Sequence, residues 1–95
     1  MDREYWARLY NRTPLRDVPL HWANMRRSPF LMEYLATVLR CCPDGGRTLE
    51  TGVGSGFGAI WLSLRGIFAE GIDYAPGIVE RAMQVNNILR GGATF

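Results

Sequence analysis

The stretch LETGVGSGFG, residues 49–58, decides the fold class of this 95-residue chain. It places a glycine at every second position from Gly52 to Gly58, between one short apolar run and another. Glycines between a strand and a helix let the backbone turn tightly and approach a ligand closely, at φ angles that other residues resist. The helix that follows presents unpaired backbone N–H groups to such a ligand. The stretch therefore predicts a strand–loop–helix unit that suits a nucleotide or another adenosine-bearing cofactor.

Short strands and helices alternate around this loop. Residues 47–50 and 67–72 predict two strands, and residues 57–64 predict a helix that is apolar nearly all round and therefore buried against a sheet. Residues 76–90 predict an amphipathic helix, and residues 93–95 predict the start of a third strand. Strand and helix in alternation predict an α/β fold with parallel strands joined by right-handed crossovers. The apolar face of the second helix comprises Ile78, Val79, Ala82, Met83, Asn86 and Leu89.

Residues 1–46 predict an N-terminal helical segment, ahead of a cofactor-binding domain in residues 47–95. A short helix capped by Asp2 carries Tyr5, Trp6, Leu9 and Tyr10 on one face, and the Pro-containing stretch 14–24 predicts a connecting loop. Ser28 followed by Pro29 predicts a helix start, since serine caps helices and proline suits the first helical position. That helix is expected to run to about Cys41, with a turn at residues 43–46.

Two acidic residues strengthen the cofactor interpretation. Asp73 ends the second predicted strand, where a carboxylate can accept both hydroxyls of a ribose held at the strand tips. Its distance from the glycines matches the roughly 20-residue interval of a ribose-binding acid. Glu50 immediately precedes the glycines, where burying a carboxylate is costly unless backbone N–H groups or a cationic ligand compensate it.

The segment Glu50-Thr51-Gly52-Val53-Gly54-Ser55-Gly56 resembles the first motif of class I S-adenosylmethionine-dependent methyltransferases, an acid followed by G-x-G-x-G. Gly71-Ile72-Asp73-Tyr74, followed by Pro76, resembles the second motif of that family. The resemblance implies that the glycines wrap the methionine part of the cofactor and that Glu50 orders the loop near its ammonium group. It also implies that Asp73 holds the ribose and that Tyr74 lies beside the adenine. The expected cofactor-binding residues are Glu50, Thr51, Gly52, Val53, Gly54, Gly56, Asp73 and Tyr74.

The resemblance spans about half of the chain and implies a partial Rossmann-like methyltransferase fold. The family fold has a larger sheet, whereas this sequence ends at Phe95, where the third strand would begin. The resemblance implies an enzyme, an S-adenosylmethionine-dependent methyltransferase, whose methyl acceptor and catalytic residues are not assigned. Methyl transfer by this chain alone is not implied. The first strand is expected to have an open edge, because only one of its two neighbours is encoded. Self-association, or binding of a partner chain at that edge, is therefore expected.

Two other interpretations remain. Gly54-Ser55-Gly56-Phe57-Gly58-Ala59 satisfies the G-x-G-x-x-A fingerprint of an NAD(P)-binding oxidoreductase. Against it, that fingerprint normally follows an apolar strand, whereas Glu50 is charged. Counted from Gly54, the first glycine of this fingerprint, Asp73 also arrives slightly early for a dinucleotide. The third interpretation is a non-catalytic S-adenosylmethionine-binding module that needs a partner chain.

Composition and charge narrow the choice of binding partner and localisation. The net charge is only +2 and the eleven basic residues, all arginine, are scattered, so nucleic acid is not indicated as a partner. No apolar run approaches the roughly 18 residues of a membrane span, and the charged start Asp2-Arg3-Glu4 is unlike a signal peptide, so a cytoplasmic protein is expected.

Adjacent Cys41 and Cys42 lack metal-site spacing, and no metal is expected. His21, the single histidine, could act as a base at the site of the methyl acceptor, although a solvated or packed histidine is the simpler interpretation.

Overall fold

The computed structural model describes residues 3–10, 12–42, 45–75 and 77–95. The roles expected for Asp2, Pro43, Asp44 and Pro76, and for the side chains of Trp6 and Tyr10, lie outside the described residues. The elements follow in the order α1 (Arg3–Tyr10), the 3₁₀ turn η1 (Leu15–Asp17), α2 (Val18–Met25), α3 (Pro29–Cys41), β1 (Arg47–Thr51), α4 (Phe57–Ser63), β2 (Phe68–Ile72) and α5 (Ile78–Leu89).

The two strands form a small parallel sheet, with α4 as the crossover between them. The register pairs Arg47 with Phe68 at one end and Thr51 with Ile72 at the other. The fold is therefore mixed helix and strand, as the alternating pattern predicts. The expected third strand is present as a single parallel bridge between Glu70 and Thr94, in which the Gly71 N–H donates to the Thr94 carbonyl at 2.9 Å.

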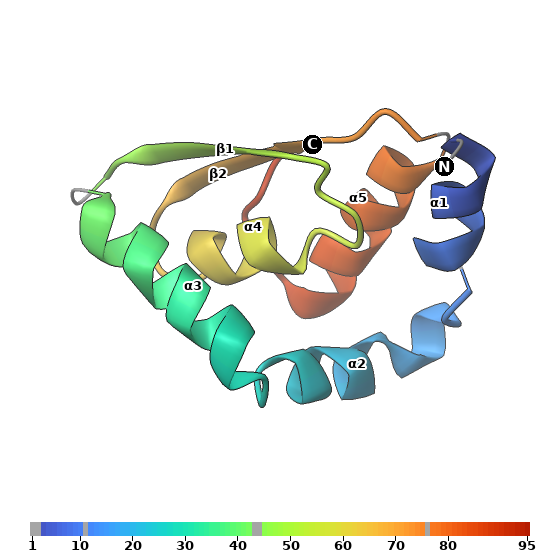
Figure 1. Cartoon of the computed structure of the whole chain (residues 1–95), viewed down its shortest axis with the longest axis horizontal. Coiled ribbons are helices and arrows are strands. Elements are labelled where there is room, and N and C mark those ends of the chain that lie inside the picture. The colour runs from blue at the N-terminus through green and yellow to red at the C-terminus, as the bar shows by residue number, and fades with distance from the viewer. Residues whose placement is uncertain (1–2, 11, 43–44, 76) are drawn as a thin grey trace.

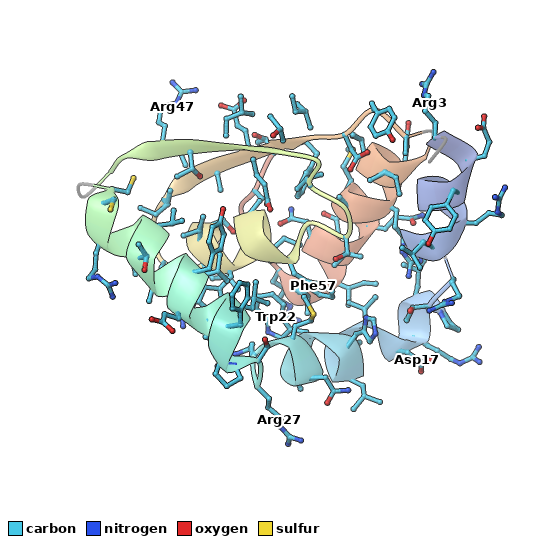
Figure 2. The ribbon with its side chains drawn as sticks, in the orientation of Figure 1. Arg3, Asp17, Trp22, Arg27, Arg47 and Phe57 are labelled. Carbon is cyan, nitrogen blue, oxygen red and sulfur yellow. The ribbon has the colours of Figure 1, made fainter. Side chains whose placement is uncertain are left out.

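The described helices lie on one side of this sheet (Figure 1). On the face that the helices cover, Ala69 and Gly71 of β2 are buried. On the opposite face, Leu49 and Phe68 are 62% and 65% exposed. Arg47 points away from the helices (Figure 2) and its Nη2 lies 3.0 Å from Oε1 of Glu70 in an exposed ion pair. We call this surface the bare sheet face; it comprises Arg47, Leu49, Thr51, Phe68, Glu70 and Ile72.

One hydrophobic core runs across the division expected at residue 46. The central helix α4 buries Ile60 completely, and the same cluster contains Val18 of α2 and Leu35 of α3. The rings of Trp22 and Phe57 lie 5.5 Å apart where α2 meets α4 (Figure 2). The N-terminal helices therefore belong to the same packed unit as the sheet.

The expectation of a loop at residues 14–24 is wrong, because Val18–Met25 forms the helix α2. Pro19 does not prevent this helix, since it lies in the first turn, where a backbone N–H needs no intrahelical acceptor. Burial of Val18 and packing of Trp22 against α4 stabilise the helix. The start predicted for α3 is confirmed, because the Leu31 N–H donates to Oγ of Ser28 at 3.3 Å and Pro29 follows that cap.

The buried face of α5 is rotated from the expected one. Met83 was expected in the apolar face, yet it is 50% exposed, whereas Val85 is buried. Two polar residues, Arg81 and Asn86, complete the buried face, because Arg81 reaches the carbonyl of Thr13 and Asn86 binds the backbone of Ala93. Tertiary contacts with segments distant in sequence therefore determine which side of α5 turns inward.

Candidate functional site

The glycine loop between β1 and α4 has the backbone geometry that its sequence predicts. Gly52, Gly54 and Gly56 have φ angles of 65°, 58° and 83°, which L side chains rarely adopt. Between them, the Val53 N–H donates to the carbonyl of Ile72 at 3.0 Å and extends the pairing of β1 with β2 by one step. The loop is thereby held at the carboxyl ends of both strands.

Asp73 joins this loop to the end of β2. Its Oδ2 accepts from the Gly54 N–H at 3.0 Å, and its Oδ1 accepts from the Ala75 N–H at 3.0 Å. The structure therefore brings Asp73 and the glycines together as expected. The second bond is also a local cap of the turn ahead of α5. Each carboxylate oxygen has a further lone pair, so this structural role leaves acceptor capacity for a ligand.

A cavity of about 320 Å³ opens at the tips of the two strands. We call it the strand-tip cavity; it is lined by Thr51, Gly52, Ile72, Asp73 and Tyr74. Tyr74 is 56% exposed, and a Cβ atom added at Gly52 would meet nothing within 4 Å. Nε of Arg3 donates to the carbonyl of Tyr74 at 2.8 Å, so α1 reaches the rim of this cavity. Four of the expected cofactor-binding residues thus share one open recess.

Three other expected residues of the loop, Val53, Gly54 and Gly56, are buried. Cγ2 of Val53 lies 2.5 Å from where a Cβ of Gly71 would be, so a side chain at position 71 would collide with it. A Cβ at Gly56 would lie 3.0 Å from the ring of Phe95. The loop therefore packs closely against β2 and the last residues of the chain, and Gly56 and Gly71 supply the room for this contact.

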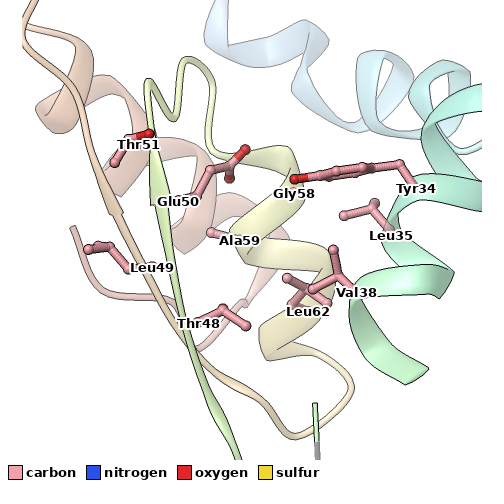
Figure 3. Close-up of a pocket in the computed structure, with 10 residues that line it drawn as sticks. All are labelled: Tyr34, Leu35, Val38, Thr48, Leu49, Glu50, Thr51, Gly58, Ala59 and Leu62. Carbon is pink, nitrogen blue, oxygen red and sulfur yellow. The ribbon is translucent and has the colours of Figure 1, made fainter. Parts of the chain in front are cut away.

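Glu50 lies apart from Asp73. Its carboxylate lines a second cavity of about 460 Å³ between β1, α3 and α4 (Figure 3). There Oε1 would lie 3.1 Å from a Cβ at Gly58, so the absence of a side chain at Gly58 lets the acid approach the first turn of α4. Figure 3 shows the hydroxyl end of Tyr34 directed toward Glu50.

Burial raises the pKa of Glu50 above its ordinary value of 4.5, and the backbone N–H of Ala59 partly offsets this effect. Oε1 is buried and has no hydrogen-bond partner among the described residues. A buried carboxylate oxygen without a partner destabilises the ionised form. The second acid of the predicted pair is thus held at the front of α4 and does not line the strand-tip cavity.

Sequence reasoning missed a third cavity, of about 150 Å³, which lies between the N-terminal helices, α5 and the glycine loop. We call it the Arg81 cavity. Arg81 and Ser55 line it, as does the exposed His21, whose ring lies 6.2 Å from that of Phe57. The available signal was the spacing of Ile78, Arg81 and Val85, which places the arginine on one helical face with two apolar residues.

The chain was compared with known protein families, curated proteins and solved structures, and none of them matches. Within the described residues, no helix is long and apolar enough to cross a membrane. In the same part of the chain, no three His, Cys, Asp or Glu side chains are grouped so that they could hold a metal ion.

Proposed function

We propose that this chain binds S-adenosylmethionine at the strand-tip cavity and supplies the cofactor-binding part of a methyltransferase. The observation that carries the proposal is the bond from the Gly54 N–H to Oδ2 of Asp73. It fixes an acid beside a glycine loop at the carboxyl ends of two parallel strands, which is where open α/β sheets bind their ligands.

The residues present fit the adenosine part of this cofactor. The free lone pairs of Asp73 can accept the two ribose hydroxyls, and the exposed ring of Tyr74 offers a face for the adenine. Gly52 leaves open space beside the acid. The volume of about 320 Å³ lies at the lower end of the roughly 300–1,000 Å³ of ligand pockets, so weak binding is expected.

Glu50 contributes to this proposal indirectly. Its carboxylate faces α4 rather than the strand-tip cavity, so it would hold the end of β1 and the start of α4 in place around the loop. The bound cofactor supplies an activated methyl group on its sulfonium centre. This chain's residues would bind and orient it, and the methyl acceptor stays unassigned.

Calorimetric titration of the full chain with S-adenosylhomocysteine tests the proposal. We expect saturable binding of S-adenosylhomocysteine and weaker or undetectable binding of NADH. Tighter binding of NADH would contradict the methyltransferase proposal and favour the dinucleotide interpretation of Gly54, Gly56 and Ala59.

A matched pair of glycine variants places the ligand. Gly52 and Gly66 both have positive φ angles and open space around an added Cβ, but only Gly52 lines the strand-tip cavity. Gly52→Leu and Gly66→Leu should each strain the backbone by about 1–2 kcal/mol. We expect only Gly52→Leu to weaken S-adenosylhomocysteine binding at least about tenfold, equivalent to about 1.4 kcal/mol. Equal binding by both variants would show that the cofactor does not occupy this cavity.

A further inference from the structure

The Arg81 cavity holds a buried positive charge. Arg81 is only 9% exposed, and among the described residues its guanidinium has one acceptor, the backbone carbonyl of Thr13. Among the described residues, no carboxylate lies within ion-pair distance of this guanidinium. The ion pair found in that part of the chain joins Arg47 to Glu70, on the bare sheet face. A guanidinium has five N–H donors, and burying its charge without a counter-ion is costly. An anion in the cavity would lower that cost.

The walls of the cavity are mainly apolar. Val18, Met25, Phe57 and Val85 line it, and the polar contributions include Arg81 and Ser55. A cavity of about 150 Å³ accommodates a molecule of roughly the size of benzene. The complementary ligand therefore has a short hydrocarbon body and one anionic end.

We propose that the Arg81 cavity binds a small organic carboxylate. The carboxylate of this ligand would accept hydrogen bonds from the N–H groups of Arg81, because a planar carboxylate matches the forked geometry of a guanidinium. Its hydrocarbon part would lie against Phe57 and Val85. Inorganic phosphate fits less well, since it has no apolar part to place against these walls.

The proposed ligand is separate from the cofactor of the proposed function. The Arg81 cavity and the strand-tip cavity have no lining residue in common. The glycine loop contributes to both, through Gly52 on one side and Ser55 on the other. The inference rests on the burial of Arg81 and stands whether or not the chain binds S-adenosylmethionine.

Butyrate and butyramide, titrated separately into the full chain at constant ionic strength, test the proposal. They share a similar shape and differ in charge. The readout is the backbone amide resonance of Ser55, followed by nuclear magnetic resonance. We expect saturable shifts with butyrate, and at least about tenfold weaker effects with butyramide and with inorganic phosphate. Absence of a saturable butyrate shift, or equal effects of acid and amide, would overturn the proposal.

Variants locate the site. Arg81→Met should abolish the butyrate response, and Arg81→Lys, which keeps a positive charge without the fork, should weaken it. Arg40→Met is the matched control, because Arg40 is an exposed arginine on α3 that does not line the cavity. Should Arg81→Met fail to fold, the Arg81→Lys variant and the comparison of butyrate with butyramide on the parent chain still test whether Arg81 binds the carboxylate. Unchanged butyrate binding in Arg81→Lys and in any folded Arg81→Met would overturn the proposal.

A competition experiment distinguishes a separate acid from the carboxylate of the cofactor itself. Saturating S-adenosylhomocysteine should leave the butyrate titration unchanged. Displacement of butyrate would show that the carboxylate held there is the cofactor's own, which would overturn the assignment of a separate ligand.

Discussion

At the scale of single residues, Glu50 lies in an environment that destabilises its ionised form. The inward face of β1 carries Thr48 and Glu50, while the apolar Leu49 points to solvent. Burial raises the pKa of Glu50, so the folded chain binds a proton more readily than the unfolded chain does. Ionised Glu50 therefore opposes folding at neutral pH.

Glu50→Gln should consequently be stabilising relative to the parent at neutral pH. Both chains are uncharged at position 50 well below pH 4.5, so the difference in unfolding free energy is smallest there. It should grow as pH rises from 4.5 through the raised folded pKa, and then stay constant, because the parent alone loses stability in that window. Urea unfolding across this pH range measures the difference.

Glu33→Gln, at an exposed position of α3, controls for the loss of one negative charge. A Glu50→Gln advantage that shrinks as pH rises would mean that the ionised acid has a partner that stabilises it.

At the scale of the elements, Asn86 joins α5 to the last residues of the chain. Its side-chain amide donates to the Ala93 carbonyl and accepts from the Ala93 N–H, both at 3.3 Å. Asn86 is buried, so losing it leaves two backbone groups unsatisfied in the interior. The bridge between Glu70 and Thr94 depends on the same segment.

Asn86→Leu should lower the unfolding free energy by about 2–4 kcal/mol, since each buried unsatisfied group costs about 1–3 kcal/mol. Asn87→Leu, at the exposed neighbouring position, should change it by no more than about 0.5 kcal/mol. Chemical denaturation of both variants makes the comparison. A similar, small effect at both positions would show that the asparagine bonds do not hold the C-terminal segment.

The same elements show what the sequence could and could not predict. The strand–glycine–helix unit and the cap at Ser28 follow from local backbone chemistry, and they are present. The partnership of Gly54 with Asp73 follows from strand order. The inward orientation of the Glu50 side chain could not be predicted, because a five-residue strand with one apolar residue has no clear inner face. Burial of Arg81 depends on Thr13, which lies 68 positions away, and the sequence pattern contains no signal for that contact.

At the scale of the whole molecule, the described helices cover the sheet on one side and leave the bare sheet face open (Figure 1). Parallel sheets are normally buried on both faces, and the bare sheet face carries three exposed apolar side chains, Leu49, Phe68 and Ile72. Within the described residues, β1 also pairs on one edge only. Both features favour association with another chain.

Sedimentation velocity should accordingly show concentration-dependent association of the purified chain. The double change Leu49→Lys and Phe68→Lys should shift the distribution toward monomer, because it places two positive charges on the bare sheet face. Leu20→Lys is the matched control, since Leu20 is 65% exposed on α2, away from the sheet. A parent chain that remains monomeric at micromolar concentration would contradict this expectation.

The contact between Trp22 and Phe57 has a consequence for the order of folding. Parallel strands cannot begin as a local hairpin, so β1 and β2 meet only after the intervening chain has folded back across them. The ring of Trp22 packs on the crossover helix that makes this return, and thus links the first quarter of the chain to a non-local pairing step of a kind that is intrinsically slow. The helix that carries Trp22 would then gain this packing partner only once the crossover helix has formed, so the first quarter of the chain is expected to pack late in folding.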